Sequence, residues 1–379
     1  MVYRTIGLMS GSSLDGLDIA FVEFQESGGK WSYEILKADC YAYNDEWIKQ
    51  LKNATALSAL DYQLLHVEYG HYTGKLVHRF IEENKLNYQV ALIASHGHTS
   101  FHIPSKRMTA QLGDGAAIAA ETKLPVVSDL RALDVALDGQ GAPIVPIGEK
   151  LLWSEYDYFL NIGGIANLSK SGEPPLGGWG FDICPANRVL NMLANDVGKN
   201  YDDGGEMAAS GSVNSSLLEK LNQLDYYKQP YPKSLANEFG TRVVYPMIKE
   251  SGCNIPDALR TFVEHITIQL VSSIKNIQHS THNNQYSNGH ITHTGEGGKL
   301  LATGGGVFNR FLMNRIKDNL KELHIEVIIP DTNLVNFKEA LIMALIGVLR
   351  WRQEYNVLSS VTGAARDSIG GALWTGQEA

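Results

Sequence analysis

GLMSGSSLDGLDIA, residues 7–20, contains two apolar segments joined by SGSSLDG (10–16), a turn of glycine and small hydroxyl residues. Apolar runs on both sides of such a turn predict a β-hairpin. The segment NIGGIAN (161–167) follows a second predicted strand at 158–162 and has the same character. One glycine-turned hairpin in each half of the chain therefore indicates a duplicated α/β domain.

A third glycine-rich turn, TGGGVFN (303–309), lies between a predicted strand and a predicted helix. Glycine permits positive φ angles and lets the backbone approach a ligand closely. Two hairpin turns on opposite sides of a cleft would hold the β- and γ-phosphates of a nucleotide, and the third turn would carry the adenosine. A single glycine turn is more often only a turn, but three in this order are far more specific. The chain has no GxxxxGK[ST] segment and no GxGxxG after its first strand, which disfavours P-loop and dinucleotide-binding folds.

Length and composition predict a globular protein with two domains. The chain has 379 residues, of which 44% are hydrophobic and 19% are charged. The formal charge of −9 argues against a general nucleic-acid binder, which needs a basic face. Three widely spaced cysteines form no disulfide pattern, so we expect a reduced, cytoplasmic protein. No long apolar run predicts a membrane span, and the N-terminus lacks the pattern of a signal peptide.

Helical periodicity is strong at 58–83 and at 256–277, and residues 338–352 are expected to form an apolar helix. A short strand ending at Ser95 is expected to deliver SHGHTSFH (95–102) to its carboxyl end, where ligands bind in open α/β sheets.

Two histidine clusters are interpreted differently. His96, His98 and His102 are favoured first as hydrogen-bonding partners of a substrate, second as structural residues and third as metal ligands. The metal comes last because the motif contains no carboxylate or cysteine. The polar segment 278–298 contains four more histidines and is interpreted as a surface loop.

Asp182 lies in GGWGFDICPAN (177–187), after a strand-like stretch and before a helix expected to begin near Asn187. The positive end of a helix dipole favours an ionised carboxylate. Such a carboxylate could accept a proton from a hydroxyl group or from water. The simpler alternative is an N-cap or turn aspartate. The position of Asp182, one strand after the second glycine hairpin, favours the general base.

Other polar residues also have structural alternatives. Arg131 could clamp a carboxylate through two hydrogen bonds or form a surface ion pair. Lys233 and Ser234 could close over a ligand or lie on unstructured surface. Glu339 opens an apolar helix, where an acidic residue ordinarily compensates the helix dipole.

Taken together, these segments resemble the anhydro-N-acetylmuramic acid kinase family, sugar kinases of the actin-like ATPase superfamily. The matching motifs occur in the family's order and cover almost the whole chain. They are GLMSGSSLDGLDIA (7–20), SHGHTSFH (95–102), QLGDGAAIA (111–119), SDLRALDVALDGQGAPIVP (128–146), NIGGIANLS (161–169), GFDICPAN (180–187), YDDGG (201–205), PKSLANEF (232–239), TGGGVFNRFLM (303–313), KEALIMAL (338–345) and TGA (362–364).

The resemblance implies a two-lobed α/β fold of the actin-like ATPase type, a duplicated ribonuclease H-like fold with an interdomain cleft. The first lobe would contain residues 1–135 and 350–379, and the second residues 136–349. Asp182 would activate a water molecule that opens 1,6-anhydro-N-acetylmuramic acid, and the freed 6-oxygen would take the γ-phosphate of ATP. The product would be N-acetylmuramate 6-phosphate, formed in murein recycling. The resemblance further implies a need for Mg²⁺ and a homodimer, with neither nucleic acid nor membrane as a partner.

The resemblance also implies roles for individual residues. ATP would contact Gly11, Ser12, Ser13, Leu14, Asp15, Gly16, Leu17, Asp18, Gly163, Gly164, Gly304, Gly305, Gly306 and Asn309. The sugar would contact His96, Arg131, Asn187 and Glu339. No residue is assigned as a metal ligand, although Asp15 and Asp18 are candidates for neighbours of a metal ion.

Departures from the family's motifs concern mainly the sugar. Ser12 stands where the family usually has threonine, and His98 stands where it usually has glutamine. The family's GFDTGPGN is replaced by GFDICPAN (180–187), and LRALD (130–134) lacks one or two of the usual arginines. These changes leave open a kinase of the same fold for another amino or anhydro sugar. A non-catalytic regulator that binds nucleotide or sugar is a further alternative, against which the intact Asp182 argues.

Overall fold

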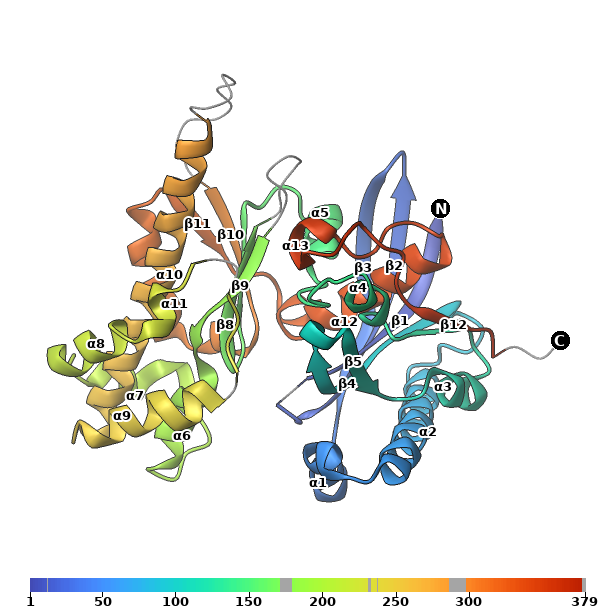
Figure 1. Ribbon diagram of the computed structural model, residues 1–379, viewed down its shortest axis with the longest axis horizontal. Helices are drawn as coiled ribbons and strands as arrows, with labels where there is room; N and C mark the ends of the chain where they lie inside the picture. Colours follow the sequence, from blue (N-terminus) through green and yellow to red (C-terminus); the bar gives the residue numbers. More distant parts are fainter. Residues whose placement is uncertain (12, 171–178, 231–232, 237, 286–297, 377–379) are drawn as a thin grey trace. The chain divides into compact units, whose positions relative to one another are not determined.

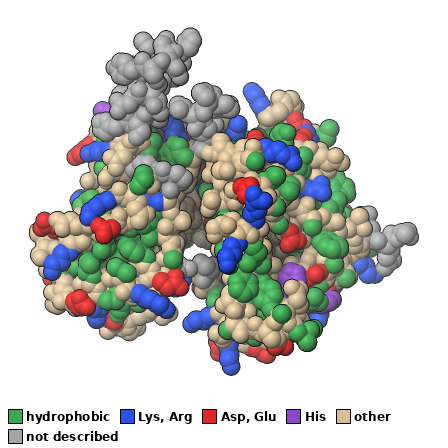
Figure 2. Space-filling view, in the orientation of Figure 1, with side chains coloured by type: hydrophobic (Ala, Val, Ile, Leu, Met, Phe, Trp, Pro, Cys, Tyr) green, Lys and Arg blue, Asp and Glu red, His purple; other side chains and the backbone are tan. Residues whose placement is uncertain are grey.

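The computed structural model describes all residues except 12, 171–178, 231–232, 237, 286–297 and 377–379, and it contains two compact units (Figure 1). The first unit contains Met1–Ser154 and Phe337–Ala379, and the second contains Glu155–Lys170 and Trp179–Asn336. Acidic and basic side chains are interspersed over the face of each unit that Figure 2 shows.

The first unit is built on a mixed sheet. Its strands are β1 (Val2–Ser10), β2 (Gly16–Ser27), β3 (Lys30–Ala42), β4 (Leu92–Ile103), β5 (Met108–Leu112), β6 (Val126–Ser128) and β12 (Ala372–Trp374). Its helices are α1 (Asp45–Asn53), η1 (Ala54–Ala56), α2 (Ala59–Glu83), η2 (Pro104–Lys106), α3 (Gly115–Thr122), α4 (Ala132–Ala136), α5 (Pro146–Leu152), residues 337–351 of α12 (Thr332–Trp351), and α13 (Ser359–Thr362).

The second unit is built on a sheet of its own. Its strands are β7 (Tyr158–Ile162), β8 (Ile165–Lys170), β9 (Trp179–Pro185), β10 (Gly298–Thr303) and β11 (Ile325–Ile328). Its helices are α6 (Asn187–Asn195), η3 (Asp203–Gly205), α7 (Glu206–Ser210), α8 (Ser215–Asn222), η4 (Asp225–Lys228), η5 (Phe239–Val244), α9 (Tyr245–Glu250), α10 (Ile255–Gln285), η6 (Gly305–Phe308) and α11 (Arg310–Lys321).

The two sheets share one topology. In the first, the order β3-β2-β1-β4-β6 combines an antiparallel meander with two strands parallel to β1. In the second, the order β9-β8-β7-β10-β11 repeats this arrangement strand for strand. The predicted duplicated α/β fold of the ribonuclease H type is therefore confirmed, and each glycine-turned hairpin joins the first two strands of its sheet.

Helices cover both faces of the first sheet. Side chains alternate along a strand, so Ile6 and Leu8 of β1 face the core shared with α2 and α3, whereas Gly7 faces α12. A Cβ atom at Gly7 would overlap the carbonyl oxygen of Ala340, so only glycine allows α12 to lie this close to β1. Helix α12 is long and apolar enough to cross a membrane, but most of it is buried, as in the core helix of a globular unit.

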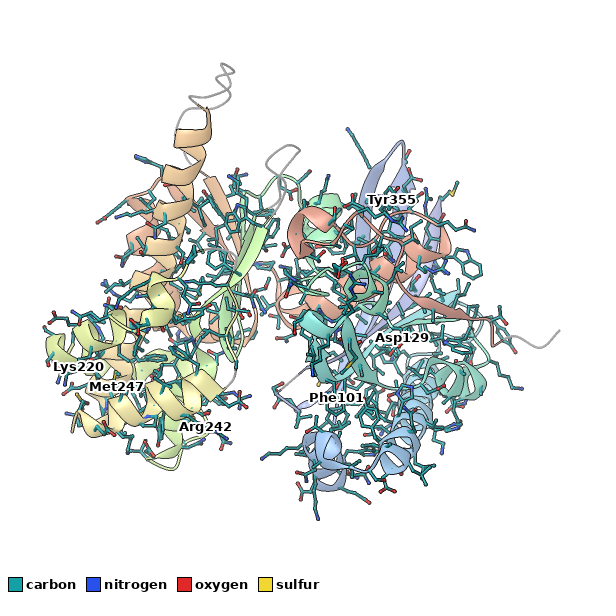
Figure 3. All side chains as sticks on the ribbon, in the orientation of Figure 1. Phe101, Asp129, Lys220, Arg242, Met247 and Tyr355 are labelled. Atoms are coloured by element: carbon teal, nitrogen blue, oxygen red, sulfur yellow. The ribbon has the colours of Figure 1, made fainter. Side chains whose placement is uncertain are left out.

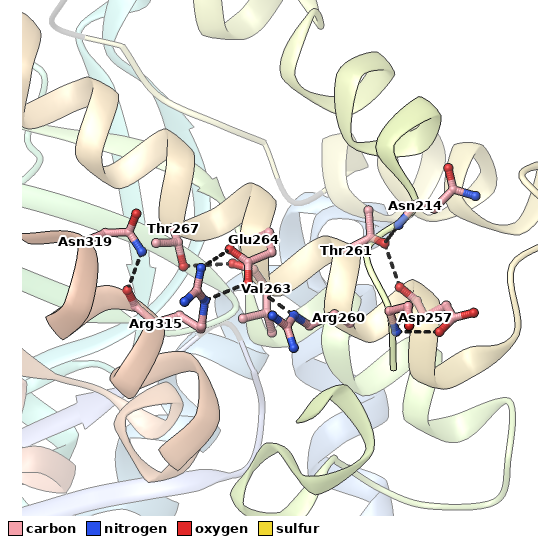
Figure 4. Close-up of polar contacts among 10 residues, drawn as sticks. Asn214, Asp257, Arg260, Thr261, Val263, Glu264, Thr267, Arg315 and Asn319 are labelled. Carbon is pink, nitrogen blue, oxygen red and sulfur yellow. Dashed lines mark hydrogen bonds and ion pairs between the residues drawn. The ribbon is translucent and has the colours of Figure 1, made fainter. Parts of the chain in front are cut away.

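Helix α10 organises the second unit, and the predicted apolar face at 256–277 is confirmed by the burial of its residues in the core. Its polar face also carries a buried group, Glu264. The Glu264 carboxylate accepts two hydrogen bonds from Arg315 of α11, at 2.7 and 3.0 Å, and one from Arg260 at 3.2 Å (Figure 4). This paired carboxylate joins α10 to α11 without leaving a buried charge uncompensated.

Three predicted boundaries are wrong. Helix α12 begins at Thr332, six residues before the predicted start at 338, because Leu334, Val335 and Phe337 extend its buried apolar face. Glu339 therefore lies inside the helix and does not open it, so its interpretation as a first-turn residue that compensates the helix dipole is wrong.

The strand expected to end at Ser95 continues to Ile103, because its second half pairs antiparallel with β5. Figure 3 labels Phe101 on this second half. The polar composition of this half hid the strand, since tertiary pairing and not apolar alternation stabilises it. Helix α10 continues to Gln285, into the segment 278–298 that was predicted to be a loop. Residues 286–297 of that segment lie outside the described part of the chain.

Candidate active site

In the first unit, a chain of buried hydroxyl groups anchors the glycine turn between β1 and β2. Tyr43 donates its hydroxyl hydrogen to Ser10 Oγ at 2.8 Å, and Ser10 Oγ lies 3.1 Å from His98 Nδ1. The hydroxyl of Tyr69 on α2 contacts that of Tyr43. Burial lowers the pKa of His98 to about 4, so the neutral ring accepts the Ser10 hydrogen at Nδ1. Ser10, which begins the turn, is thus held directly by Tyr43 and His98 and, through Tyr43, by Tyr69.

The turn residues assigned to ATP lie at one end of β1 and β2, except Ser12, which is outside the described residues. At Gly11 a Cβ atom would meet only Ser13 Oγ, at 3.6 Å. At Gly16 a Cβ atom would lie 2.5 Å from the carbonyl oxygen of Tyr41 on β3. Packing therefore requires glycine at position 16 but not at position 11. The turn also contains Leu14, whose φ of 61° is uncommon for a residue other than glycine.

Carboxyl groups gather around this hairpin. Burial, with the charges of Glu339 and Asp15, raises the pKa of Asp18 to about 6, against a hydrogen bond with Cys40 that lowers it. Burial also raises the pKa of Glu339, against the positive charges of Lys338 and Arg131. The fold of the first unit thus places Glu339, near the far end of the chain, within electrostatic reach of the first glycine turn.

His96 and Arg131 form a hydrogen-bonded pair. Arg131 Nε donates to His96 Nε2 at 2.8 Å, and His96 Nδ1 donates to the carbonyl oxygen of Gly97 at 2.8 Å. Burial lowers the pKa of His96 to about 3, which keeps the ring neutral and able to accept at Nε2. Arg131 also donates to the carbonyl oxygen of Gly141. Arg131 forms no ion pair among the residues that the structure describes, so the alternative of a surface ion pair is wrong.

In the second unit, the hairpin turn of Gly163 and Gly164 rests on the start of α6. The backbone N–H groups of Ala186 and Asn187 donate to the carbonyl oxygens of Gly164 and Gly163, at 2.8 and 3.0 Å. The Asn187 side chain donates to the carbonyl oxygen of Ile162 at 3.0 Å. A Cβ atom at Gly163 or Gly164 would make only ordinary contacts, at 3.5 Å or more. Neither packing nor positive φ demands glycine at these two positions.

The third glycine turn lies at the same edge of the second sheet, because Thr303 at the end of β10 pairs with Asn161 of β7. Gly304 has a φ of +82°, and a Cβ atom on Gly306 would overlap the side chain of Ile162. Here packing itself demands glycine. Asn309 then begins α11 by accepting a hydrogen bond from the N–H of Leu312 at 2.9 Å.

Two buried polar atoms in this region have no hydrogen-bond partner among the described residues. They are Thr303 Oγ1 and Arg188 Nε. The Arg188 side chain runs beside Gly164, with Nε 3.7 Å from the position of a Cβ atom there. Buried polar groups are normally hydrogen-bonded. The unpaired Arg188 Nε and Thr303 Oγ1 are therefore suited to bind an anionic or polar ligand at the glycine turns.

Asp182 lies within β9, not after it, and α6 begins five residues later in the chain. Its Oδ2 accepts a hydrogen bond from the N–H of Leu235 at 2.8 Å. Burial raises the pKa of Asp182, and this hydrogen bond opposes the shift. The group that favours the ionised carboxylate is therefore a backbone N–H from another segment and not the predicted helix end.

Sequence reasoning missed several residues that hold these groups. Tyr226 donates its hydroxyl hydrogen to the carbonyl oxygen of Asp182 at 2.6 Å, and Tyr43 acts on the first turn as described above. Lys233 was considered as a residue that could close over a ligand. In the structure its carbonyl oxygen accepts a hydrogen bond from the Asp182 N–H at 3.1 Å. No local pattern marks either tyrosine.

The described residues contain no group of three or more His, Cys, Asp or Glu side chains that could hold a metal ion.

Comparisons with known proteins agree with the motifs. A family model described as anhydro-N-acetylmuramic acid kinase matches residues 3–376. The anhydro-N-acetylmuramic acid kinase of Photobacterium profundum is 32% identical, over 98% of this chain and 99% of the relative. That of Francisella tularensis subsp. novicida is 31% identical, over 97% of each chain.

The solved structures that match include the activator of the 2-hydroxyisocaproyl-CoA dehydratase from Clostridium difficile with bound ADPNP. Its TM-score is 0.42, at 14% sequence identity, over 92% of this chain and 96% of the other. The assignment rests instead on the family model and on the sequence relatives, which span the chain almost end to end. By these matches, the chain belongs to the anhydro-N-acetylmuramic acid kinase family.

Proposed function

We propose that this protein is an ATP-dependent kinase that opens 1,6-anhydro-N-acetylmuramic acid and phosphorylates its 6-oxygen. Water attacks the anomeric carbon, the bond between that carbon and the bridging 6-oxygen breaks, and the 6-oxygen attacks the γ-phosphorus of ATP. Asp182 accepts the proton of the attacking water. The products are N-acetylmuramate 6-phosphate and ADP, which places the reaction in murein recycling.

The observation that carries the proposal is the environment of Asp182. Its side chain is partly buried on the strand that pairs with β8, and β8 begins directly after Gly163 and Gly164. Burial raises the basicity of the carboxylate, while the Leu235 N–H keeps one oxygen in a fixed direction. A general base needs both a suitable pKa and a fixed position.

The glycine turns support the binding of ATP phosphates. Gly11, Gly163 and Gly164 have room for a side chain, so their glycine identity is explained by the close approach of a ligand. Arg188 Nε, which lies beside Gly164 without a hydrogen-bond partner among the described residues, is suited to donate to a phosphate oxygen. Gly304, Gly305, Gly306 and Asn309 are assigned to the adenosine. The other turn residues from Ser12 to Asp18 are assigned to the phosphates.

We assign the sugar to Asn187 and to the group that contains His96, Arg131 and Glu339. The neutral His96 and the charged Arg131 offer hydrogen bonds of different strength to hydroxyl, amide or carboxylate oxygens.

Mg²⁺ fits the chemistry, because carboxylate oxygens such as those of Asp15 and Asp18 are the ligands it prefers beside phosphates. When bound, it would neutralise charge on the transferring phosphoryl group. We further propose a cytoplasmic homodimer without nucleic-acid or membrane partners. The free thiols of Cys40, Cys184 and Cys253 support a reducing compartment.

The reaction is tested by mass spectrometry of the product formed from ATP and 1,6-anhydro-N-acetylmuramic acid in ¹⁸O-labelled water. One label retained at the anomeric position is expected under conditions of slow exchange. Turnover with related anhydro and amino sugars, followed by ADP release, separates this substrate from the alternatives. Absence of any sugar-dependent ADP release would favour a non-catalytic binding protein instead.

Asp182→Asn is expected to lower turnover by about 10²–10⁴-fold while leaving ATP affinity unchanged, because it removes the base and keeps the shape of the side chain. Steady-state kinetics and calorimetric titration of ATP measure the two effects. Asp318→Asn, at an exposed position on α11 of the same unit, is the matched control. Wild-type turnover in the Asp182 variant would remove this residue from the mechanism.

A further inference from the structure

Three residues of segment 226–235, in which residues 231–232 lie outside the described part of the chain, contact Asp182. The Tyr226 hydroxyl donates to the Asp182 carbonyl oxygen at 2.6 Å, and the Asp182 N–H donates to the carbonyl oxygen of Lys233 at 3.1 Å. The Leu235 N–H donates to Asp182 Oδ2 at 2.8 Å. β9 is the last strand of its sheet, so its outer backbone groups need partners from outside the sheet. The segment supplies those partners and orients the carboxylate with the same contacts.

The segment is itself fastened at Tyr226. The Lys233 ammonium group donates to the carbonyl oxygen of Tyr226 at 3.2 Å and lies 4.5 Å from the centre of the Tyr226 ring. A cation over an aromatic face is attracted to it. Tyr226 therefore makes two connections. Its ring and carbonyl oxygen bind Lys233, and its hydroxyl group binds the β9 backbone at Asp182.

The neighbouring Tyr227 fastens the segment to a buried histidine of α10. His265 Nε2 lies 2.9 Å from the Tyr227 hydroxyl, and His265 Nδ1 lies 2.7 Å from Asn222 Oδ1. Gln269 donates to the same Asn222 oxygen at 2.8 Å, which identifies that atom as an acceptor. His265 Nδ1 therefore carries the hydrogen, and Nε2 accepts from Tyr227. Burial lowers the pKa of His265 to about 3, so this arrangement does not titrate near neutral pH.

We propose that Tyr226 is a positioning residue for the general base Asp182, and that Tyr227 and His265 hold Tyr226 in place. This inference rests on the function proposed above. The Tyr226 hydroxyl holds the backbone of Asp182, while the segment that it fastens holds the carboxylate oxygen through Leu235. Loss of the hydroxyl would let both the strand and the segment move. A displacement of about 1 Å at a reacting group can cost on the order of 10²-fold in rate.

The test variant is Tyr226→Phe, which removes one hydroxyl group and keeps the ring under Lys233. We expect kcat to fall by about 10–100-fold, with the KM for ATP changed by less than about twofold, because the nucleotide turns are untouched. Tyr227→Phe should show a smaller loss in the same direction, because it acts one contact further away. Tyr245→Phe is the control, since the Tyr245 hydroxyl in the same unit binds Asp196 instead, at 2.8 Å.

A second readout does not depend on turnover. In this segment and strand, burial raises the pKa values of Tyr226 and Cys184, and the charge of Asp182 contributes to the rise. Burial lowers the pKa of Lys233, and Cys184 opposes this shift. The Leu235 N–H opposes the rise in the pKa of Asp182, so a loosened segment should raise that pKa further. Titration of the ¹³C-labelled Asp182 carboxyl group by NMR should therefore move to higher pH in Tyr226→Phe and stay unchanged in Tyr245→Phe.

The two proposals fail in different ways. A wild-type protein that turns over no sugar would refute the proposed function, and the NMR titration would still test the contact between the segment and Asp182. An active wild type together with a Tyr226→Phe variant of unchanged kcat and unchanged Asp182 titration would overturn the positioning role. A thermal unfolding scan of each variant ensures that only folded proteins are compared.

Discussion

Burial raises the pKa of two carboxyl groups in the glycine-turn regions, Asp18 in the first unit and Asp182 in the second. The surroundings differ. Each has one hydrogen bond that favours its ionised form, from the Leu235 N–H to Asp182 and from Cys40 to Asp18, but only Asp18 also has the negative charges of Glu339 and Asp15 nearby. A protein retains such an unfavourable charge mainly where a ligand or cation compensates it. Asp18 therefore lowers the stability of the unliganded protein.

Asp18→Asn is expected to stabilise the unliganded protein at pH 8 by about 1–2 kcal/mol, after allowance for partial solvent screening. The folded-state pKa of about 6 lies above the ordinary value of 3.8. The protonated form thus favours folding at low pH, and this contribution is lost as the pH rises through about 6. The advantage of the variant should therefore shrink between pH 8 and pH 4.

Urea unfolding at these two pH values, without nucleotide, measures the effect. The exposed Asp318→Asn variant should show no such change with pH. An advantage of Asp18→Asn that is equal at both pH values would refute the electrostatic explanation.

At the scale of elements, the glycines of the three turns are of two kinds. The first turn contains both, since packing requires glycine at position 16 but not at position 11. Gly304 and Gly306 are demanded by positive φ or by packing against the β7 strand. Gly163 and Gly164 are demanded by neither, as expected of glycines that a phosphate approaches closely. A substitution that is harmless to folding can thus reveal a binding function, because it fills space that the free protein leaves open.

Gly163→Ala is expected to leave the free energy of unfolding within about 1 kcal/mol of the wild type. It should weaken ATP binding by about tenfold, or 1.4 kcal/mol, because the methyl group would separate phosphate and backbone. Gly306→Ala should instead destabilise the fold by about 1–3 kcal/mol through overlap with Ile162. Chemical unfolding and calorimetric titration of ATP give the two quantities. Equal ATP affinity in Gly163→Ala and wild type would exclude this turn from the phosphate site.

At the scale of the whole molecule, the first unit is closed by the return of the chain's last segment. Lys338 of α12 forms a buried ion pair with Glu149 of α5, with the atoms 2.6 Å apart. Thr362 donates to the buried carboxylate of Asp134 at 2.7 Å. The Gly141 carbonyl oxygen accepts a hydrogen bond from the Arg131 guanidinium group, and the Gly141 N–H donates to the Asp134 carboxylate. These contacts connect the segment after residue 337 to the loop that positions Arg131.

Lys338→Met is expected to destabilise the protein by about 3–5 kcal/mol, because it leaves the Glu149 carboxylate buried without its cation. The double variant Lys338→Met with Glu149→Met should recover most of this loss, since an apolar pair replaces the ion pair. Lys228→Met, which removes an exposed ion pair with Asp225, should cost at most about 1 kcal/mol. Urea unfolding of the four proteins measures these differences. A double variant no more stable than Lys338→Met would contradict the explanation.

Local sequence predicted many of the elements because their determinants lie within the elements themselves. The strand at 158–162 has the predicted bounds, the helix predicted at 58–83 is α2 at Ala59–Glu83, and a helix follows the third glycine turn as predicted. The ordered motifs predicted the duplicated fold and the family. The extension of β4 was missed because its stability comes from pairing with β5, which the pattern of β4 alone does not show.

The residue types of the candidate site, its glycine turns and the aspartate at position 182 can all be read from the order of amino acids, because backbone conformation and chemistry are local properties. The electrostatic state of that aspartate, the tautomers of His96 and His265, and the role of Tyr226 depend on the folded structure. They arise from contacts between residues tens of positions apart, such as the 44 positions between Asp182 and Tyr226. Burial and hydrogen bonding exist only once the chain has brought such residues together.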